Sequence, residues 1–346
     1  MSKQSHIERT AHEPRDTSLH TLTIAHITQV SPTIRLFRLA IPPDDSITFL
    51  PGQWVDLHPP PAAQVPKPGG FTITSSPSLA LPNHTHKHNP THLEQQEEET
   101  PYIELAIQSS PSNPAAAYLF LPAPQLLHTP VQVRIGGSFV FPPPPFLRST
   151  TNTGVDGDAA PPLRKVVLVA GGMGVNPLVS MLSWIGEQQQ QAQGGLFEGV
   201  EVRMLYSVRD YEGAAAVDGG AGTGPEMEGG GGGGGILFLE RIAGLFDSGR
   251  VKGGLRLFLT RGGSVGGDGV GEASGGVVRC AGGVGVPFLR RRMTIGDVEE
   301  AVGEDKEAAV VYVCGVPGMT DEFVELLVLP EGFGMDPRRV LFEKWW

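Results

Sequence analysis

VVLVAGGMGVNPLVSML, from Val166 to Leu182, is the stretch of this chain that decides its fold. It begins with five apolar residues, a run typical of a central parallel strand covered on both faces. Glycines then remove side chains where the backbone must turn sharply, at Gly171, Gly172 and Gly174. Pro177 suits the first turn of a helix, and apolar residues follow it at helical spacing, at Leu178, Met181, Leu182 and Ile185. The stretch predicts a buried strand, a glycine turn and a helix.

The glycine turn is the first candidate binding site. Free N–H groups at the start of a helix attract anions such as phosphate. The spacing Gly172-x-Gly174-x-x-Pro177 departs from the dinucleotide fingerprint G-x-G-x-x-G at its third position. A tight strand-to-helix turn without a ligand therefore stays open as the alternative. The residues predicted to contact a dinucleotide here are Gly171, Gly172, Gly174, Val175, Asn176 and Pro177.

Composition excludes several classes of protein. A length of 346 residues suits about two domains, and a net charge of −11 argues against non-specific nucleic-acid binding. With only Cys280 and Cys314, the chain can build neither a disulfide framework nor a four-thiolate iron–sulfur cluster. The run Arg290–Arg292 is expected to be a solvated turn before a helix, with contact to a phosphate or an acidic partner as the alternative.

Targeting signals are not evident. No apolar run approaches the length of a membrane span, so none is expected. Residues 1–16 mix basic with acidic side chains: Lys3, Arg9 and Arg15 with Glu8, Glu13 and Asp16. Transit peptides contain few acidic residues, so this segment shows no clear targeting signal. A cytoplasmic and a mitochondrial location both stay open.

Two regions differ in hydrophobic period. From residue 20 to 141 the period is two, which predicts short antiparallel strands at 21–30, 33–41, 53–58, 71–76, 102–110 and 131–141. From residue 165 onward strand-like runs alternate with helical patterns, at 166–170, 201–208, 255–260 and 308–315. The fold predicted is a two-domain β + α/β protein. An N-terminal antiparallel β-barrel over 18–148 precedes a C-terminal Rossmann-like parallel-sheet domain over 164–346.

Three inserts have too little apolar surface to order themselves, and we expect loops at 83–99, 213–235 and 262–276. The first of them carries four histidines beside three glutamates, which raises a metal site as a hypothesis: His84, His86, His88, His92, Glu97, Glu98 and Glu99. Nothing nearby fixes the geometry of metal ligands. We therefore interpret the insert as a solvated loop and predict no metal site.

Four further segments point to one family. They are GGFTITSSP at 69–77, SNPAAAYL at 112–119, YVCGVPGMTDEF at 312–323 and FEKWW at 342–346. In this order, with the glycine turn between the second and the third, the chain resembles the ferredoxin-reductase-like flavoenzyme superfamily. The resemblance covers nearly the whole chain outside the inserts. It implies an FAD-binding barrel and an NAD(P)-binding α/β domain, with hydride passing from reduced nicotinamide to the flavin.

The resemblance assigns flavin contacts to the barrel. Phe71 matches an aromatic residue laid on the flavin, Thr72 the hydroxyl offered to flavin N5, and Ser75 the last serine of that motif. Gly69 replaces the arginine that grips the flavin pyrophosphate, a charge-assisted contact worth about one to two decades in affinity. Ser112 or Asn113 would cap a helix facing the pyrophosphate. An ordinary barrel strand with no flavin stays open for residues 71–76.

The resemblance also assigns the second half of the site. The run Cys314–Met319 matches Cys-Gly-Pro-x-x-Met except at Val316, placing Cys314, Gly315 and Met319 beside the nicotinamide. The ending Glu343-Lys344-Trp345 resembles Glu-x-aromatic, with Trp345 or Trp346 covering the flavin. The alternatives are that Cys314 is a small buried hydrophobe and that the two tryptophans fill a structural groove. Thr72, Cys314 and Glu343 are the catalytic candidates.

Cofactor choice depends on the end of the strand at 201–208. Arg209 could bind a 2′-phosphate and Asp210 a ribose hydroxyl, and the balance favours NADH. The implied function is a flavin-dependent NAD(P)H oxidoreductase that passes electrons to an unidentified acceptor, a small molecule or a protein. The alternative is an NAD(P)-binding or assembly protein on the same fold with weak or lost flavin binding. The presence of Gly69 and Val316 favours this alternative.

Overall fold

The computed structural model of the chain describes residues 5–82, 100–143, 163–190, 197–209, 235–260, 275–280 and 282–345. The backbone divides into two compact units, one of Met1–Pro144 with Val179–Trp184 and one of Pro145–Leu178 with Ile185–Trp346. The domain limits expected at residues 148 and 164 stay a prediction, because nearly all of the connecting segment lies outside the described residues. The units are described separately below.

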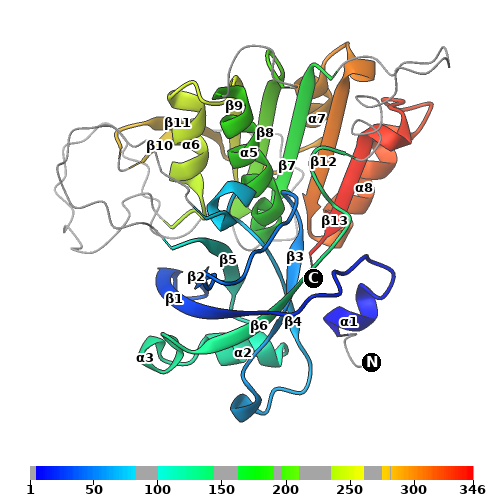
Figure 1. Cartoon of the computed structure of the whole chain (residues 1–346). Helices are drawn as coiled ribbons and strands as arrows, with labels where there is room; N and C mark the ends of the chain where they lie inside the picture. The colour runs from blue at the N-terminus through cyan, green and yellow to red at the C-terminus, as the bar shows by residue number, and fades with distance from the viewer. Residues whose placement is uncertain are drawn as a thin grey trace. The chain divides into compact units, whose positions relative to one another are not determined.

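The described strands of the first unit form an antiparallel barrel (Figure 1). Their order is β4-β3-β6-β1-β2-β5, and every pairing along it is antiparallel. A bridge between Ile73, just after β4, and Leu105 on β5 joins the two ends of this order. The strands are β1 (His20–Ser31), β2 (Ile34–Ala40), β3 (Trp54–His58), β4 (Gly69–Thr72), β5 (Tyr102–Gln108) and β6 (Pro130–Gly136). The barrel expected from the period-two pattern is confirmed.

Side chains at alternate positions of the strands point inward and fill the barrel with an apolar core. On β3, for example, Val55 and Leu57 are fully buried in the apolar core. Helix α2 (Pro114–Leu119) packs Ala115 and Leu119 on the same core, and α3 (Ala123–Leu126) follows it. Two short 3-10 turns, η1 (Pro61–Ala63) and η2 (Pro77–Ala80), lie on either side of β4 in the sequence. A short helix that the sequence did not predict, α1 (His6–Arg9), precedes β1.

The described strands of the second unit form a mainly parallel sheet in the order β10-β11-β9-β8-β7-β12-β13. Their bounds are β7 (Lys165–Gly171), β8 (Glu201–Arg209), β9 (Gly253–Thr260), β10 (Gly275–Arg279), β11 (Gly285–Leu289), β12 (Ala309–Gly315) and β13 (Val340–Lys344). Only the β10–β11 hairpin is antiparallel. The parallel α/β fold is confirmed, whereas the hairpin and β13 were not predicted. Gly275 and Gly276 are a correction, because they pair in β10 and do not belong to a loop.

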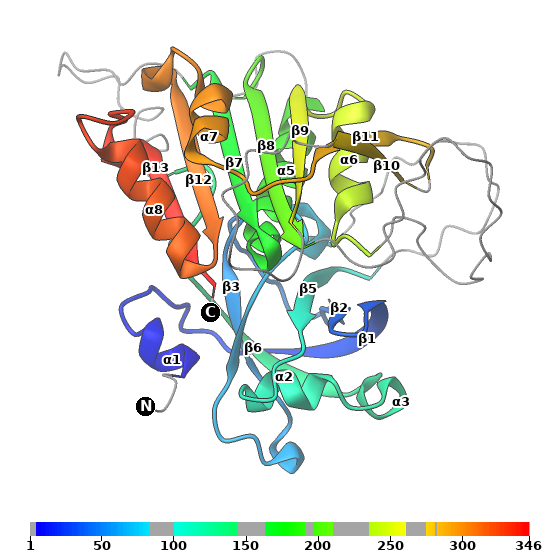
Figure 2. The ribbon, with the colours of Figure 1, turned by 180° about the vertical axis from the view of Figure 1, so that it is seen from behind.

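Helices cover both faces of this sheet. Helices α5 (Val175–Gln190) and α6 (Leu239–Asp247) lie on one face, and α7 (Ile295–Val302) and α8 (Pro317–Val328) on the other (Figure 2). Residues of β7 and β12 pack with α7 and α8 in one apolar cluster that includes Val167, Val313, Val298 and Phe323. The 3-10 turns η4 (Lys306–Ala308) and η5 (Pro337–Arg339) precede β12 and β13.

The glycine turn lies where this sheet reverses its order. Strands β8 and β9 lie on one side of β7, and β12 and β13 on the other, so successive connections leave β7 in opposite directions. Ligands bind in such sheets at the carboxyl ends of the strands next to this reversal. The turn itself is a 3-10 turn, η3 (Gly172–Gly174), and α5 begins directly after it at Val175. Pro177 is the third residue of this helix and thus lies in its first turn, as the sequence predicts.

Several expectations concern residues outside the described part of the chain. These are the histidine-rich insert at 83–99, nearly all of the glycine-rich inserts, Asp210 and Trp346. The described residues contain no group of three or more metal-ligating side chains that could hold an ion. Their helices include none that is long and apolar enough to cross a membrane.

Candidate functional site

Gly172 is the open position of the glycine turn. Its backbone has φ +55°, a left-handed conformation that favours glycine. A Cβ built there would meet no atom of the described residues within 4 Å. The backbone at Gly172 is therefore accessible to a ligand on the side where other residues would carry a side chain.

Gly174 has a different role from the one expected. A Cβ on Gly174 would overlap the carbonyl group of Cys314 and lie 2.8 Å from the nitrogen of Gly315. The missing side chain thus allows the turn to pack directly on the carboxyl end of β12. The Cβ position of Gly174 therefore faces backbone, and the contact between Gly174 and a dinucleotide stays a prediction.

Met319 covers the carboxyl ends of β7 and β12. A Cβ on Gly171 would lie 2.9 Å from the methyl carbon of Met319 and 3.0 Å from its sulfur. A Cβ on Gly315 would overlap the same methyl group. The missing side chains at both glycines leave room for the Met319 thioether, and the structure brings these three predicted site residues together.

The Cys314 thiol is fully buried on β12, in register with Glu343 on β13. Burial, and then the charge of Glu343, raise the pKa of this thiol well above its ordinary value, although the Trp345 side chain acts in the opposite direction. The backbone N–H of Trp345 donates to the carbonyl of Gly315 at 2.8 Å. The thiol is therefore protonated at neutral pH, which suits a packed neutral group better than a nucleophile.

Helix starts at this edge of the sheet contribute further groups. Val175 and Asn176 are fully buried in the first turn of α5. Thr320, in the first turns of α8, is also fully buried, and its hydroxyl oxygen has no hydrogen-bond partner among the described residues. The sequence analysis missed Thr320, although its position directly after Met319 could have singled it out. Arg209 ends β8 with an exposed side chain.

Phe71 is buried in the barrel core. It is 4 % exposed and belongs to the core cluster with Ala115 and Leu119 of α2. A Cβ on Gly69 would lie 2.7 Å from two atoms of the Phe71 ring and 2.8 Å from the Cβ of Ala115. The ring therefore lies against Gly69 and α2, and it offers no open face on which a flavin could stack. The Cβ of an arginine at position 69 would meet this ring and Ala115.

The start of α2 satisfies its own N–H groups. The Asn113 side-chain oxygen accepts from the nitrogens of Ala115 and Ala116 at 3.2 and 3.3 Å, so the expected cap is Asn113. The nitrogen of Ala117 donates to the Asn113 carbonyl at 2.9 Å, and Pro114 has no N–H. Ser112 instead lies beside Ser110, with 3.2 Å between their hydroxyls. The first turn retains no N–H group for a pyrophosphate.

Beyond Phe71, the end of β4 and the residues just after it include buried polar side chains. Thr72 and Ser75 are each 1 % exposed. The Ser75 hydroxyl accepts from the Glu104 nitrogen at 3.0 Å, and the Thr74 hydroxyl donates to the Glu104 carboxylate at 2.9 Å. Sequence reasoning missed Glu104, because an acid at an alternate position of a strand reads as solvent-facing. Glu104 is 3 % exposed, and its contacts join the residues just after β4 to β5, next to the bridge between Ile73 and Leu105.

The two candidate sites differ in how they fit a cofactor. At the barrel, the pyrophosphate arginine is absent, the aromatic ring is packed in the core and the helix start is capped by its own side chain. The residues present do not fit FAD as the resemblance implied. At the glycine turn, an open left-handed glycine lies between the carboxyl end of β7 and the start of α5. These residues fit the phosphate of a dinucleotide.

Relatives of the chain share one name. No protein-family model matches the sequence. A Bos taurus protein is 27% identical over 346 residues, spanning 99% of this chain and 86% of its own length. A Xenopus laevis protein is 28% identical over 344 residues, spanning 99% and 84%. Both are named oxidoreductase NAD-binding domain-containing protein 1. The chain is similar to oxidoreductase NAD-binding domain-containing protein 1.

Solved structures agree with this likeness at the level of the fold. A ferredoxin NADP+ reductase from Neisseria gonorrhoeae with bound FAD and NADP has a TM-score of 0.54 at 13% identity, covering 96% of this chain and 100% of its own. The FAD/NAD-binding domain of a nitric oxide dioxygenase from Vibrio cholerae has a TM-score of 0.52 at 13% identity, covering 94% and 98%. The expected ferredoxin-reductase-like fold is confirmed.

Proposed function

We propose that this chain binds a pyridine dinucleotide, NAD(H) or NADP(H), at the carboxyl ends of β7 and β12. The observation that carries the proposal is Gly172, whose left-handed backbone leaves open space where a side chain would stand. Gly172 also lies at the reversal of strand order, where sheets of this type take their ligands. The name shared by the relatives, which refers to NAD binding, supports the same assignment.

The dinucleotide would be held in two parts. The turn from Gly171 to Pro177 would bind the phosphates, because the start of α5 directs N–H groups and a positive dipole end toward an anion. Gly315 and Met319 would border the nicotinamide half, with Cys314 as a neutral group behind them. Arg209 would contact the adenosine end, where an exposed cation favours a 2′-phosphate. The preference for NADH inferred from the sequence stays a prediction.

We propose further that the barrel binds FAD weakly or not at all. Gly69 supplies no cation, Phe71 fills the space beside it, and Asn113 takes the N–H groups of α2. Of the two functions that the sequence left open, the geometry therefore supports the NAD(P)-binding or assembly protein. Cytoplasmic and mitochondrial locations remain equally open.

A second function keeps support from one observation. The Thr72 side chain is almost fully buried, at 1 % exposed, and ends β4, the strand on which the resemblance places the flavin contacts. A hydroxyl of this kind suits the contact to flavin N5 that the resemblance assigns to it. In this alternative the chain is an FAD-dependent NAD(P)H oxidoreductase, in which a bound flavin would accept hydride. Its electrons would pass to an unidentified acceptor.

One preparation distinguishes these functions. We expect the purified full-length chain to be colourless in the visible range and to quench or shift NADH fluorescence on titration. A yellow protein that loses its flavin absorbance on addition of NADH would favour the oxidoreductase instead. A folded chain that binds neither NADH nor NADPH would contradict the proposed dinucleotide site.

A further inference from the structure

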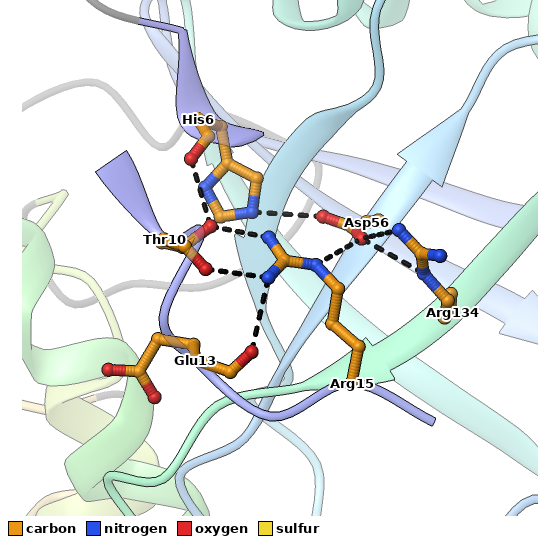
Figure 3. Close-up of polar contacts among 6 residues, drawn as sticks. All are labelled: His6, Thr10, Glu13, Arg15, Asp56 and Arg134. Atoms are coloured by element: carbon orange, nitrogen blue, oxygen red, sulfur yellow. Dashed lines mark hydrogen bonds and ion pairs between the residues drawn. The ribbon is translucent and has the colours of Figure 1, made fainter. Parts of the chain in front are cut away.

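The segment Ser5–Asp16, here called the N-terminal strap, crosses the outer face of three barrel strands. It contains α1, and its side chains gather around Asp56 of β3 (Figure 3). The strap reaches β6 with its backbone, β3 with charged side chains and β4 with an imidazole ring. These contacts lie within the first unit.

On β6 the strap adds backbone pairing. The nitrogen of Asp16 donates to the carbonyl of Ile135 at 2.9 Å, and the nitrogen of Gly137 donates to the carbonyl of Pro14 at 3.0 Å. Arg15 forms an antiparallel bridge with Gly136. Because β1 pairs with the preceding residues of β6, these bonds continue the same ladder.

On β3 the strap neutralises a buried carboxylate. Asp56 is fully buried on the outer face of the barrel, opposite Arg134 of β6, which donates to it at 2.8 Å. Arg15 donates to the same oxygen at 3.0 Å, and a His6 ring nitrogen lies 3.1 Å from the other oxygen (Figure 3). Two of the three partners of Asp56 thus come from the strap.

The strap also covers Trp54. The His6 ring meets the indole edge-on with 4.7 Å between centroids, and the Arg15 guanidinium lies 4.8 Å from the indole centroid. Trp54 is 3 % exposed as a result of these contacts and of its position on β3. Its cross-strand neighbour on β4 is Thr72.

On β4 the strap lies against Gly70, which has no side chain to block it. A Cβ on Gly70, the cross-strand neighbour of Asp56, would overlap the imidazole of His6. The absence of a side chain at position 70 therefore makes room for the strap. Sequence and structure agree in this detail, because a glycine in a strand often marks the close approach of another group.

We propose that the N-terminal strap is a conformational device that holds β4 on β3 and β6 and so maintains the form of the barrel. Three of the residues weighed above as part of a targeting segment contact the barrel: Glu13, Arg15 and Asp16. Arg15 pairs with Asp56, and the Glu13 carboxylate accepts from the nitrogen and hydroxyl of Ser138 at 2.9 and 2.6 Å. Loss of residues 5–16 would leave Asp56 with Arg134 alone and would uncover Trp54.

A size-swap cycle in the full-length chain tests the proposal. His6→Ala removes the ring, and Gly70→Ala forces a methyl group against it. Each change alone should lower the Tm, by about 2–4 °C. In the double variant the new methyl occupies the space left by the ring, so the combined loss should be smaller than the sum of the two. His12→Ala is the matched control, because that side chain is 78% exposed.

Hydrogen–deuterium exchange supplies a second measurement. The Gly137 N–H donates to the strap, so its exchange should accelerate in His6→Ala and in Gly70→Ala, while amides of β7 stay unchanged. Exchange across Gly69–Thr72 should accelerate with it. Additive losses of Tm in the cycle, or a His6→Ala variant that behaves like His12→Ala, would overturn the proposal. Unchanged exchange at Gly137 and β4 in variants of lowered Tm would also overturn it.

Discussion

At the scale of single residues, neighbouring glycines of one turn have separate tasks. Gly172 is open and left-handed, whereas Gly174 touches the backbone of β12. The sequence predicts that glycine is needed at both positions, because both lie in a sharp strand-to-helix turn. It cannot predict which glycine faces a ligand and which faces the fold, because that depends on where Cys314, far along the chain, passes.

Gly174→Ala should reduce stability before it affects ligand binding. The new methyl would overlap the Cys314 carbonyl, which is backbone and cannot rotate away. Overpacking of this kind costs about 1–3 kcal/mol of unfolding free energy. Chemical denaturation of the variant and the parent measures this loss, with Gly318→Ala as a control because a Cβ there meets nothing within 4 Å. A Gly174→Ala variant as stable as the parent would show that the turn can shift away from β12.

At the scale of helices and strands, some elements follow from the sequence pattern, and others depend on residues distant in the sequence. The strands at 166–170 and 308–315 were predictable, because a run of five to seven apolar residues is typical of a strand buried on both faces of a sheet. The β10–β11 hairpin was not, because its residues include glycines that read as loop. The strap was also missed, because its mixed charges resemble a solvated terminus until Asp56 is placed beneath them.

The segment Arg290–Arg292 illustrates a partial correction. It was expected to be a solvated turn, and Arg292 is indeed exposed. Arg291 instead binds both carboxylate oxygens of Asp297 at 2.6 Å and lies 5.1 Å from the Phe258 ring centroid. Asp297 also accepts from the nitrogen and hydroxyl of Thr294 at 2.8 Å, which caps the start of α7.

Asp297 should therefore make stability depend on acid pH. Burial raises its pKa, but hydrogen bonds from Arg291 and Thr294 outweigh burial and leave the pKa below its ordinary value. A carboxyl whose pKa is lower in the folded state adds stability above its unfolded pKa, about 4, and loses it as pH falls through the folded value. Asp297→Asn should lower unfolding free energy at pH 7 and weaken the decline below pH 4.

Urea unfolding of Asp297→Asn and of the parent between pH 7 and pH 3 is the measurement. Arg292→Ala serves as the control, because it removes a charge from the same turn without touching Asp297. Parallel pH curves for the parent and Asp297→Asn would contradict this account of the α7 cap.

For the whole molecule, the sequence predicts the architecture better than the cofactors. A hydrophobic period of two predicts the barrel, and the alternation of strand-like and helix-like runs predicts the parallel sheet. The strand orders confirm both predictions. Cofactor binding depends on whether groups are open or already partnered. Phe71 and Asn113 match the expected residue types, yet one is packed in the core and the other bonds to its own helix.

Affinity of NADH for Gly172→Ala tests the central claim most directly. Gly199→Ala is its matched partner, because Gly199 is also left-handed, with φ +79°, and a Cβ there also meets nothing within 4 Å. Both changes impose similar backbone strain, but only Gly172 lies in the turn before α5. We expect NADH binding to weaken about tenfold or more, roughly 1.4 kcal/mol, in Gly172→Ala and to stay at the parental value in Gly199→Ala. Equal affinities in the two folded variants would contradict a dinucleotide site at this turn.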